Sequence, residues 1–154
     1  MTTRIFSYGS NLHLADLDRY ADEHGFPRPE LEPIGPGWLD NRRLSFGYQG
    51  RVRIGGCLDV RPAPGHRAPG YIFEVRDDTT LDLLDHKEGH PDYYRRLYTR
   101  AQTDHGELDV LAWEVTPARR IDPVPPSDHY LALVRSGYER WGLPIGMLLE
   151  AAAG

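Results

Sequence analysis

The chain has 154 residues, of which 40% are hydrophobic, and this is enough to build the core of one globular domain. Its formal net charge is −5 and its arginines are spread along the chain, so nucleic acid is not an expected partner. No apolar run approaches the roughly 18 residues that cross a bilayer, and no signal-peptide pattern opens the sequence. We therefore expect a single domain over residues 1–154 that works in the cytoplasm without a membrane partner.

Cys57 is the one cysteine of the sequence. A single cysteine cannot form an internal disulfide, which is compatible with a reducing cytoplasm. Because it follows two glycines in a strand-like stretch, we interpret it as a small core residue rather than a nucleophile.

The first 25 residues predict a strand, a tight turn and a helix. Residues 3–8 have the pattern of a strand, and the turn Tyr8-Gly9-Ser10-Asn11-Leu12 follows it directly. Gly9 lets the backbone approach a ligand, and serine and asparagine are good helix caps. Residues 12–24 carry apolar side chains at helical spacing, and Gly25 is predicted to end that helix.

Short strands are predicted through the middle of the sequence. Four prolines between residues 27 and 36 indicate an extended or looped passage. Glycines and prolines then separate four predicted strands, at residues 36–41, 43–48, 54–60 and 70–76.

A short helix is predicted next, with Thr79 and Asp82 as a capping-box-like start and Gly89 as its end. Residues 93–103 and 107–116 follow as the two strands of a hairpin.

Ser127 is the predicted N-cap of a last helix, which carries an apolar stripe and ends at Gly142. Many short strands with three helices predict an α+β fold. Its sheet is expected to form a small mixed, largely antiparallel β-barrel flanked by about three helices.

The turn at residues 8–12 suits an anion. It is predicted to open onto a helix N-terminus, where unpaired N–H groups and a partial positive charge favour a carboxylate or a developing oxyanion. An ordinary strand-turn-helix junction with a Ser or Asn cap would use the same residues, so both interpretations stay open at this point.

Glu88 is the second residue with a chemical signal, because it lies at the C-terminal end of a short helix. That end of a helix disfavours an anion, and partial burial would raise the pKa of Glu88 further, as a proton-shuttling group requires. A solvated carboxylate at a helix end is the alternative.

His86 and His90 are four residues apart and could ligate a metal on one helix. Gly89 interrupts that helix, and the residue order of a zinc protease is absent, so no metal or other cofactor is expected. Ser10 also lacks the setting of a nucleophile elbow.

These motifs together resemble the gamma-glutamyl cyclotransferases of the AIG2-like superfamily. The matching segments are residues 8–12, 37–39, 43–46, 70–75, 84–89, 94–96 and 126–130, with Gly137 and residues 142–144. The resemblance implies a small barrel with a cavity at one end. It also implies a reaction in which the α-amine of a γ-glutamyl group attacks its own γ-carbonyl, forming 5-oxoproline and releasing an amine or amino acid.

The resemblance also implies roles for particular residues. Glu88 matches the acid/base of the family, and Tyr94 and Tyr130 match pocket tyrosines. Tyr93 could take the place of Tyr94, because the segment after Glu88 differs from that of some relatives. The strand and loop that match the substrate-holding segment are Ile5, Phe6, Ser7, Tyr8, Gly9, Ser10, Asn11 and Leu12.

Two other functions remain open at this point. A non-catalytic module of the same fold would bind a carboxylate in the cavity, although Glu88 would oppose such a ligand. A metal-dependent hydrolase would use His86 and His90 and would lose activity with a chelator. The expected partner is in each case a small molecule, the chain is expected to be a monomer or homodimer, and the leaving group stays undetermined.

Overall fold

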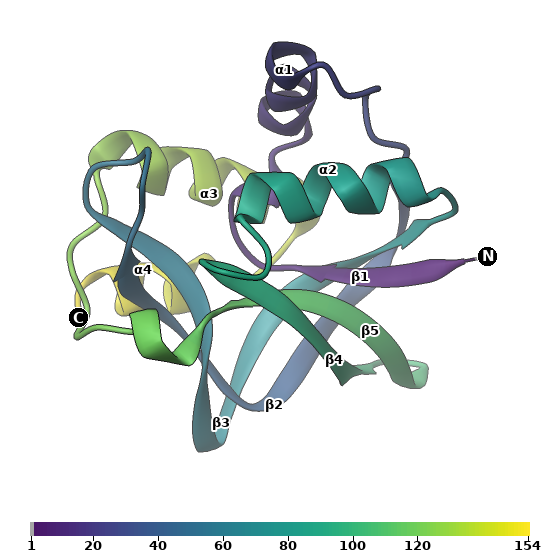
Figure 1. The fold of residues 1–154 in the computed structure, drawn as a ribbon. Helices are drawn as coiled ribbons and strands as arrows, with labels where there is room; N and C mark the ends of the chain where they lie inside the picture. Colours follow the sequence, from purple (N-terminus) through teal and green to yellow (C-terminus); the bar gives the residue numbers. More distant parts are fainter. Residues whose placement is uncertain (1) are drawn as a thin grey trace.

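A five-stranded barrel forms the centre of the protein (Figure 1). The computed structural model describes residues 2–154. The strands close in the order β1-β3-β2-β4-β5; β1 and β5 are parallel, and the other neighbours are antiparallel. This mixed, largely antiparallel barrel confirms the predicted α+β fold class. The strands are β1 (Thr3–Ser7), β2 (Glu32–Gln49), β3 (Gly56–Val75), β4 (Tyr94–Thr103) and β5 (Gly106–Val115).

Helices pack around the barrel, with α1 and α2 above the strands in Figure 1. Within residues 2–154 there are four α-helices, one more than predicted, and none is long and apolar enough to cross a membrane. The additional helix has no side-chain cap at its N-terminus, so the sequence lacks the usual start signal. The α-helices are α1 (Leu14–His24), α2 (Asp78–Glu88), α3 (Asp128–Trp141) and α4 (Ile145–Ala152), and the 3-10 turns are η1 (Ser10–Leu12) and η2 (Pro117–Arg119).

The two long strands each join two segments that were predicted as separate strands. Strand β2 continues through Asn41, which adopts a left-handed φ of 58° at a register shift between Asp40 and Arg42. Such a bulge lets a strand bend without ending. Pro33, predicted in an extended or looped passage, lies in β2 beside a similar shift, where a proline does not interrupt regular pairing.

Most predicted helix ends are confirmed. Gly25, Gly89 and Gly142 all adopt the left-handed conformation directly after their helices. Ser127 caps α3 by accepting a hydrogen bond from the backbone N–H of Tyr130 at 3.1 Å. The predicted start of α2 was wrong, because Asp77 rather than Thr79 is the N-cap and accepts from Thr80 N at 2.6 Å.

The turn after β1 differs from the prediction in one respect. Ser10–Leu12 form the separate 3-10 turn η1, and α1 begins two residues later than predicted, at Leu14. His13 connects the two elements, because its Nδ1 accepts a hydrogen bond from Asp16 N at 3.1 Å. The turn therefore has its own geometry, fixed by its contacts with α3 and α1.

Gly137 permits the close contact between α3 and η1. A Cβ at Gly137 would lie 2.6 Å from Leu12 Cβ, and Leu12 is 1% exposed. We expect Gly137→Ala to lower the free energy of unfolding by about 1–3 kcal/mol, because the overlap outweighs the better helix propensity of alanine. Urea unfolding measures this change, with Gly146→Ala as the control, since no atom lies within 4 Å of that added Cβ. The account of this contact is wrong if both variants are stabilised alike.

Candidate active site

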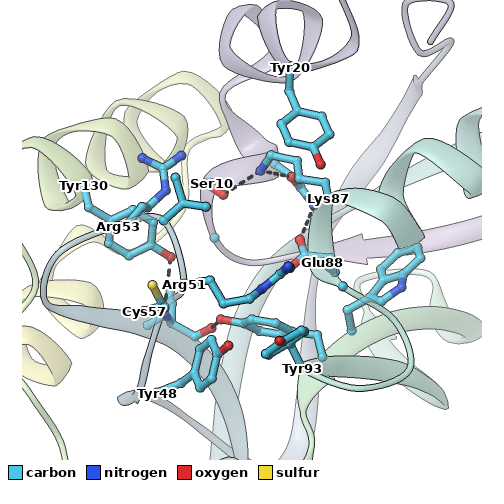
Figure 2. A pocket seen from close by; sticks show the side chains of 18 of the residues that line it. Ser10, Tyr20, Tyr48, Arg51, Arg53, Cys57, Lys87, Glu88, Tyr93 and Tyr130 are labelled. Atoms are coloured by element: carbon cyan, nitrogen blue, oxygen red, sulfur yellow. Dashed lines mark hydrogen bonds between the residues drawn. The ribbon is translucent and has the colours of Figure 1, made fainter. Parts of the chain in front are cut away.

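A pocket of about 990 Å³ opens where the turn after β1, the end of α2 and the start of α3 meet (Figure 2). The sequence-predicted site residues Ile5 and Leu12 do not line it. Both are 1% exposed and belong to the hydrophobic core, so their placement in the pocket wall was wrong. The predicted residues that do line the pocket are Phe6, Ser7, Tyr8, Gly9, Ser10, Asn11, Glu88, Tyr94 and Tyr130, and Tyr93 lines it as well.

Glu88 lies beside the turn that precedes α1, although 77 residues separate them in the sequence. Its Oε1 accepts a hydrogen bond from Asn11 Nδ2 at 2.9 Å. Helix α2 presents Glu88 as its last residue, and Gly89 then turns the chain away with a φ of 70°. The structure therefore brings the predicted acid/base and the predicted anion-binding turn together at one pocket.

Lys87 connects the same groups, and it was not among the predicted site residues. Its Nζ donates to Ser10 Oγ at 2.9 Å and to Asn11 Oδ1 at 2.7 Å. Only one orientation of the Asn11 amide satisfies both neighbours, with its oxygen towards Lys87 and its nitrogen towards Glu88. A signal was present in the sequence: of 18 Lys and Arg residues, 17 are arginine, and Lys87 is the one lysine.

Burial raises the pKa of Glu88 above its ordinary value, even though the Lys87 ammonium and the Asn11 hydrogen bond act to lower it. The side chain is partly exposed to the pocket, but protein atoms surround it on its other sides. Burial likewise lowers the pKa of Lys87. A carboxylate that is reachable, poorly hydrated and hydrogen-bonded can both accept and return a proton near neutral pH.

We expect Lys87→Met to move the acid limb of the pH–activity profile to higher pH. The Lys87 ammonium lowers the pKa of Glu88, so its removal raises that pKa and leaves less of the carboxylate ionised at a given acidic pH. The measurement is kcat/KM against pH, with Lys87→Arg as the control that keeps a positive charge. An unchanged or lowered limb in Lys87→Met would show that Lys87 does not act on Glu88.

Buried tyrosines form the wall of the pocket. Tyr8 OH donates to the Trp113 carbonyl oxygen, and Tyr94 OH donates to the Leu58 carbonyl oxygen at 2.8 Å. Tyr130 OH instead accepts from Leu58 N at 3.2 Å, so its own proton is not used in that bond. Burial raises the pKa of all three phenols, so they are neutral groups at physiological pH.

Two arginines of the loop between β2 and β3 (residues 50–55) also reach the pocket, and neither was predicted from the sequence as a site residue. Arg53 lies 3.4 Å from Asp16 and 5.0 Å from the centre of the Tyr130 ring. Arg51 lies 3.9 Å from the centre of the Tyr93 ring. Nothing in the sequence separates these two from the other arginines, because only the barrel brings their loop beside α2.

The two histidines considered as metal ligands are engaged in other contacts. His86 Nδ1 lies 2.7 Å from Tyr20 OH, and His90 Nδ1 accepts from Arg96 N at 3.2 Å. Across residues 2–154 no three His, Cys, Asp or Glu side chains are grouped as metal ligands would be. Cys57 lines the pocket from β3 and is 7% exposed, as expected of a small core residue.

Several solved structures share this fold. A structure described as "Gamma-glutamyl cyclotransferase" aligns over 99% of this chain and 88% of its own, with a TM-score of 0.81 and 21% identity. An uncharacterized protein from Homo sapiens aligns over 99% and 87% with a TM-score of 0.77 and 23% identity. YkqA from Bacillus subtilis aligns over 97% and 52% with a TM-score of 0.77 and 20% identity. At these identities the likeness shows the fold.

Comparison of the sequence with family models assigns the chain to a family. A comparison with curated proteins yields no match. Residues 5–132, however, match the family model described as "Gamma-glutamyl cyclotransferase, AIG2-like". This match spans β1 to the first turn of α3, and so includes both the loop after β1 and Glu88. The chain therefore belongs to the gamma-glutamyl cyclotransferase, AIG2-like family.

Proposed function

We propose that the protein is a gamma-glutamyl cyclotransferase, which converts a γ-glutamyl amide into 5-oxoproline and a free amine or amino acid. The observation that carries this proposal is the 2.9 Å contact between Glu88 Oε1 and Asn11 Nδ2 at the wall of one pocket. It sets a carboxylate of raised pKa beside the side chain of a residue in η1, the turn whose first backbone N–H groups are the proposed oxyanion donors.

Glu88 acts as the proton shuttle of this reaction. Its carboxylate takes a proton from the α-ammonium of the substrate, and the resulting amine attacks the γ-carbonyl carbon. A C–N bond forms to close the five-membered ring, and the C–N bond to the leaving group breaks. Glu88 returns that proton to the departing nitrogen as its C–N bond breaks. It then takes the second proton from the ring nitrogen and passes it to the released amine, so the products are the neutral lactam and an ammonium and no water is consumed.

The turn at residues 8–11 holds the other side of the reacting group. Ser10 and Asn11 begin η1, and the first N–H groups of a helical turn have no partner within that turn. Such donors stabilise the oxyanion that develops when the amine attacks the carbonyl. Holding the substrate in a curled conformation itself contributes greatly to the reaction rate, because well-oriented intramolecular reactions reach effective molarities of roughly 10⁵ M or more.

The test is to incubate the purified protein with γ-glutamyl amino acids and γ-glutamyl amines and to measure 5-oxoproline by mass spectrometry. We expect 5-oxoproline and the free leaving group in equal amounts, with or without a chelator. Substrate binding without product would favour the carboxylate-binding module instead. Activity that a chelator abolishes would favour the metal-dependent hydrolase.

A further inference from the structure

Arg51 extends from the 50–55 loop across the pocket towards Glu88 (Figure 2). Its guanidinium lies against the backbone of the residue that follows Glu88: a Cβ at Gly89 would be 2.5 Å from Arg51 Nη2. The absence of a side chain at position 89 therefore leaves the space that the guanidinium occupies.

The Arg51 guanidinium is held in place but not neutralised. It stacks on one side of the Tyr93 ring at 3.9 Å from the ring centre, and Arg119 lies 4.3 Å from the same centre. Arg53 has an acidic partner in Asp16, whereas Arg51 has no carboxylate oxygen within 4.0 Å among residues 2–154. A stacked guanidinium keeps its planar edge of N–H donors available, and that edge matches the two oxygens of a carboxylate.

Resting on the proposed cyclotransferase activity, we propose that Arg51 binds the carboxylate of the leaving amino acid. The substrate class is then a γ-glutamyl amino acid, rather than a γ-glutamyl amine. The pocket is lined by equal numbers of cationic and carboxylate side chains: Arg19, Arg51, Arg53 and Lys87 against Glu23, Asp85, Glu88 and Asp92. The assignment therefore depends on the position of the Arg51 guanidinium and not on an excess of positive charge.

The position of Arg51 favours the leaving group over the glutamyl half of the substrate. The glutamyl half must lie against the turn at residues 8–11, where Tyr8 is buried. Arg51 is exposed and stands on the outer side of the pocket. When the departing nitrogen is at Glu88, the carboxylate of its amino acid is only two bonds away, and it therefore lies within reach of the guanidinium beside Gly89.

The test compares γ-glutamyl-alanine with γ-glutamyl-ethylamide, because ethylamine is alanine without its carboxylate. We expect Arg51→Gln to lower kcat/KM for γ-glutamyl-alanine by about tenfold or more, which is the effect of losing one charge-assisted pair. Both substrates are compared at a pH above the acid limb, because loss of the Arg51 charge also raises the pKa of Glu88. There the value for γ-glutamyl-ethylamide changes less than about twofold, since that substrate never makes the contact. The matched control is Arg67→Gln, because Arg67 stacks on Trp38 at 3.9 Å but lies outside the pocket; it leaves both values unchanged.

An equal loss for the two substrates would overturn this assignment, because Arg51 would then serve the glutamyl half or the fold. No loss for either substrate would overturn it as well. Wild-type protein that forms no 5-oxoproline from either substrate gives a different result, which contradicts the proposed function and the role of Arg51 with it. Circular dichroism of each variant confirms that the fold is retained.

Discussion

Glu88→Gln is expected to abolish 5-oxoproline formation while the protein stays folded. Glutamine keeps an oxygen that can accept the Asn11 hydrogen bond but cannot take or return a proton. General acid–base catalysis contributes about 10²–10⁴-fold in rate, so kcat should fall by that amount. Asp82→Asn is the matched control, because Asp82 is an exposed carboxylate on the same helix; this variant is expected to keep its activity.

Glu88→Gln should also be more stable than the wild type at neutral pH. Burial raises the pKa of Glu88 in the folded protein above its unfolded value. The folded state then holds the Glu88 proton more tightly than the unfolded state does. Stability is therefore lost as the pH rises from the unfolded pKa of Glu88 to its folded pKa, and the loss persists at higher pH. Glutamine removes that cost, and the melting temperature at pH 7 should rise. A lower melting temperature together with lost activity would point to a structural role for Glu88.

The second large effect is expected from Asn11→Asp. This change replaces a donor 2.9 Å from the Glu88 carboxylate by a second carboxylate. Two carboxylates at this distance disfavour each other's ionisation, so Glu88 holds its proton to higher pH, although Lys87 Nζ lies 2.7 Å from the Asn11 side-chain oxygen and opposes the effect. We expect kcat/KM at pH 7 to fall by about 10- to 100-fold and the acid limb to move to higher pH.

The pH profile separates this charge effect from a loss of packing. Asn11→Ala also removes the hydrogen bond but adds no charge, so its acid limb should move less than that of Asn11→Asp. Activity of Asn11→Asp should recover as the pH rises, because the shared proton is then lost. If the two variants had identical profiles, the electrostatic coupling between positions 11 and 88 would be disproved.

Local sequence patterns predicted which helices and strands form better than they predicted the lengths of these elements. Each correct helix end depends on a local signal, such as the left-handed glycine at position 89 or the serine cap of α3. The merging of predicted strands into β2 and β3 depends on bulges such as the one at Asn41, where pairing between β2 and β3 continues on both sides and outweighs a local turn signal. Helix α4 has no polar cap, so no local pattern marks its start.

Site residues that belong to a local sequence motif were predicted. Those that only folding brings into the pocket were missed. The turn at residues 8–11 and Glu88 were recognised as motifs, and the structure places them in contact. Lys87 and Arg51 were missed because their importance comes from neighbours that are distant in sequence. The reverse error concerns Ile5 and Leu12, which belong to the matching segment but point into the core.

The most direct test of the central claim is to run the reaction in water enriched in ¹⁸O. Attack by the substrate's own amine uses no water, so the account predicts that γ-glutamyl-alanine yields unlabelled 5-oxoproline and alanine. Hydrolysis would instead yield glutamate with one ¹⁸O atom in its γ-carboxylate. Mass spectrometry of the products distinguishes the two outcomes, and labelled glutamate as the main product would contradict the intramolecular reaction proposed for Glu88.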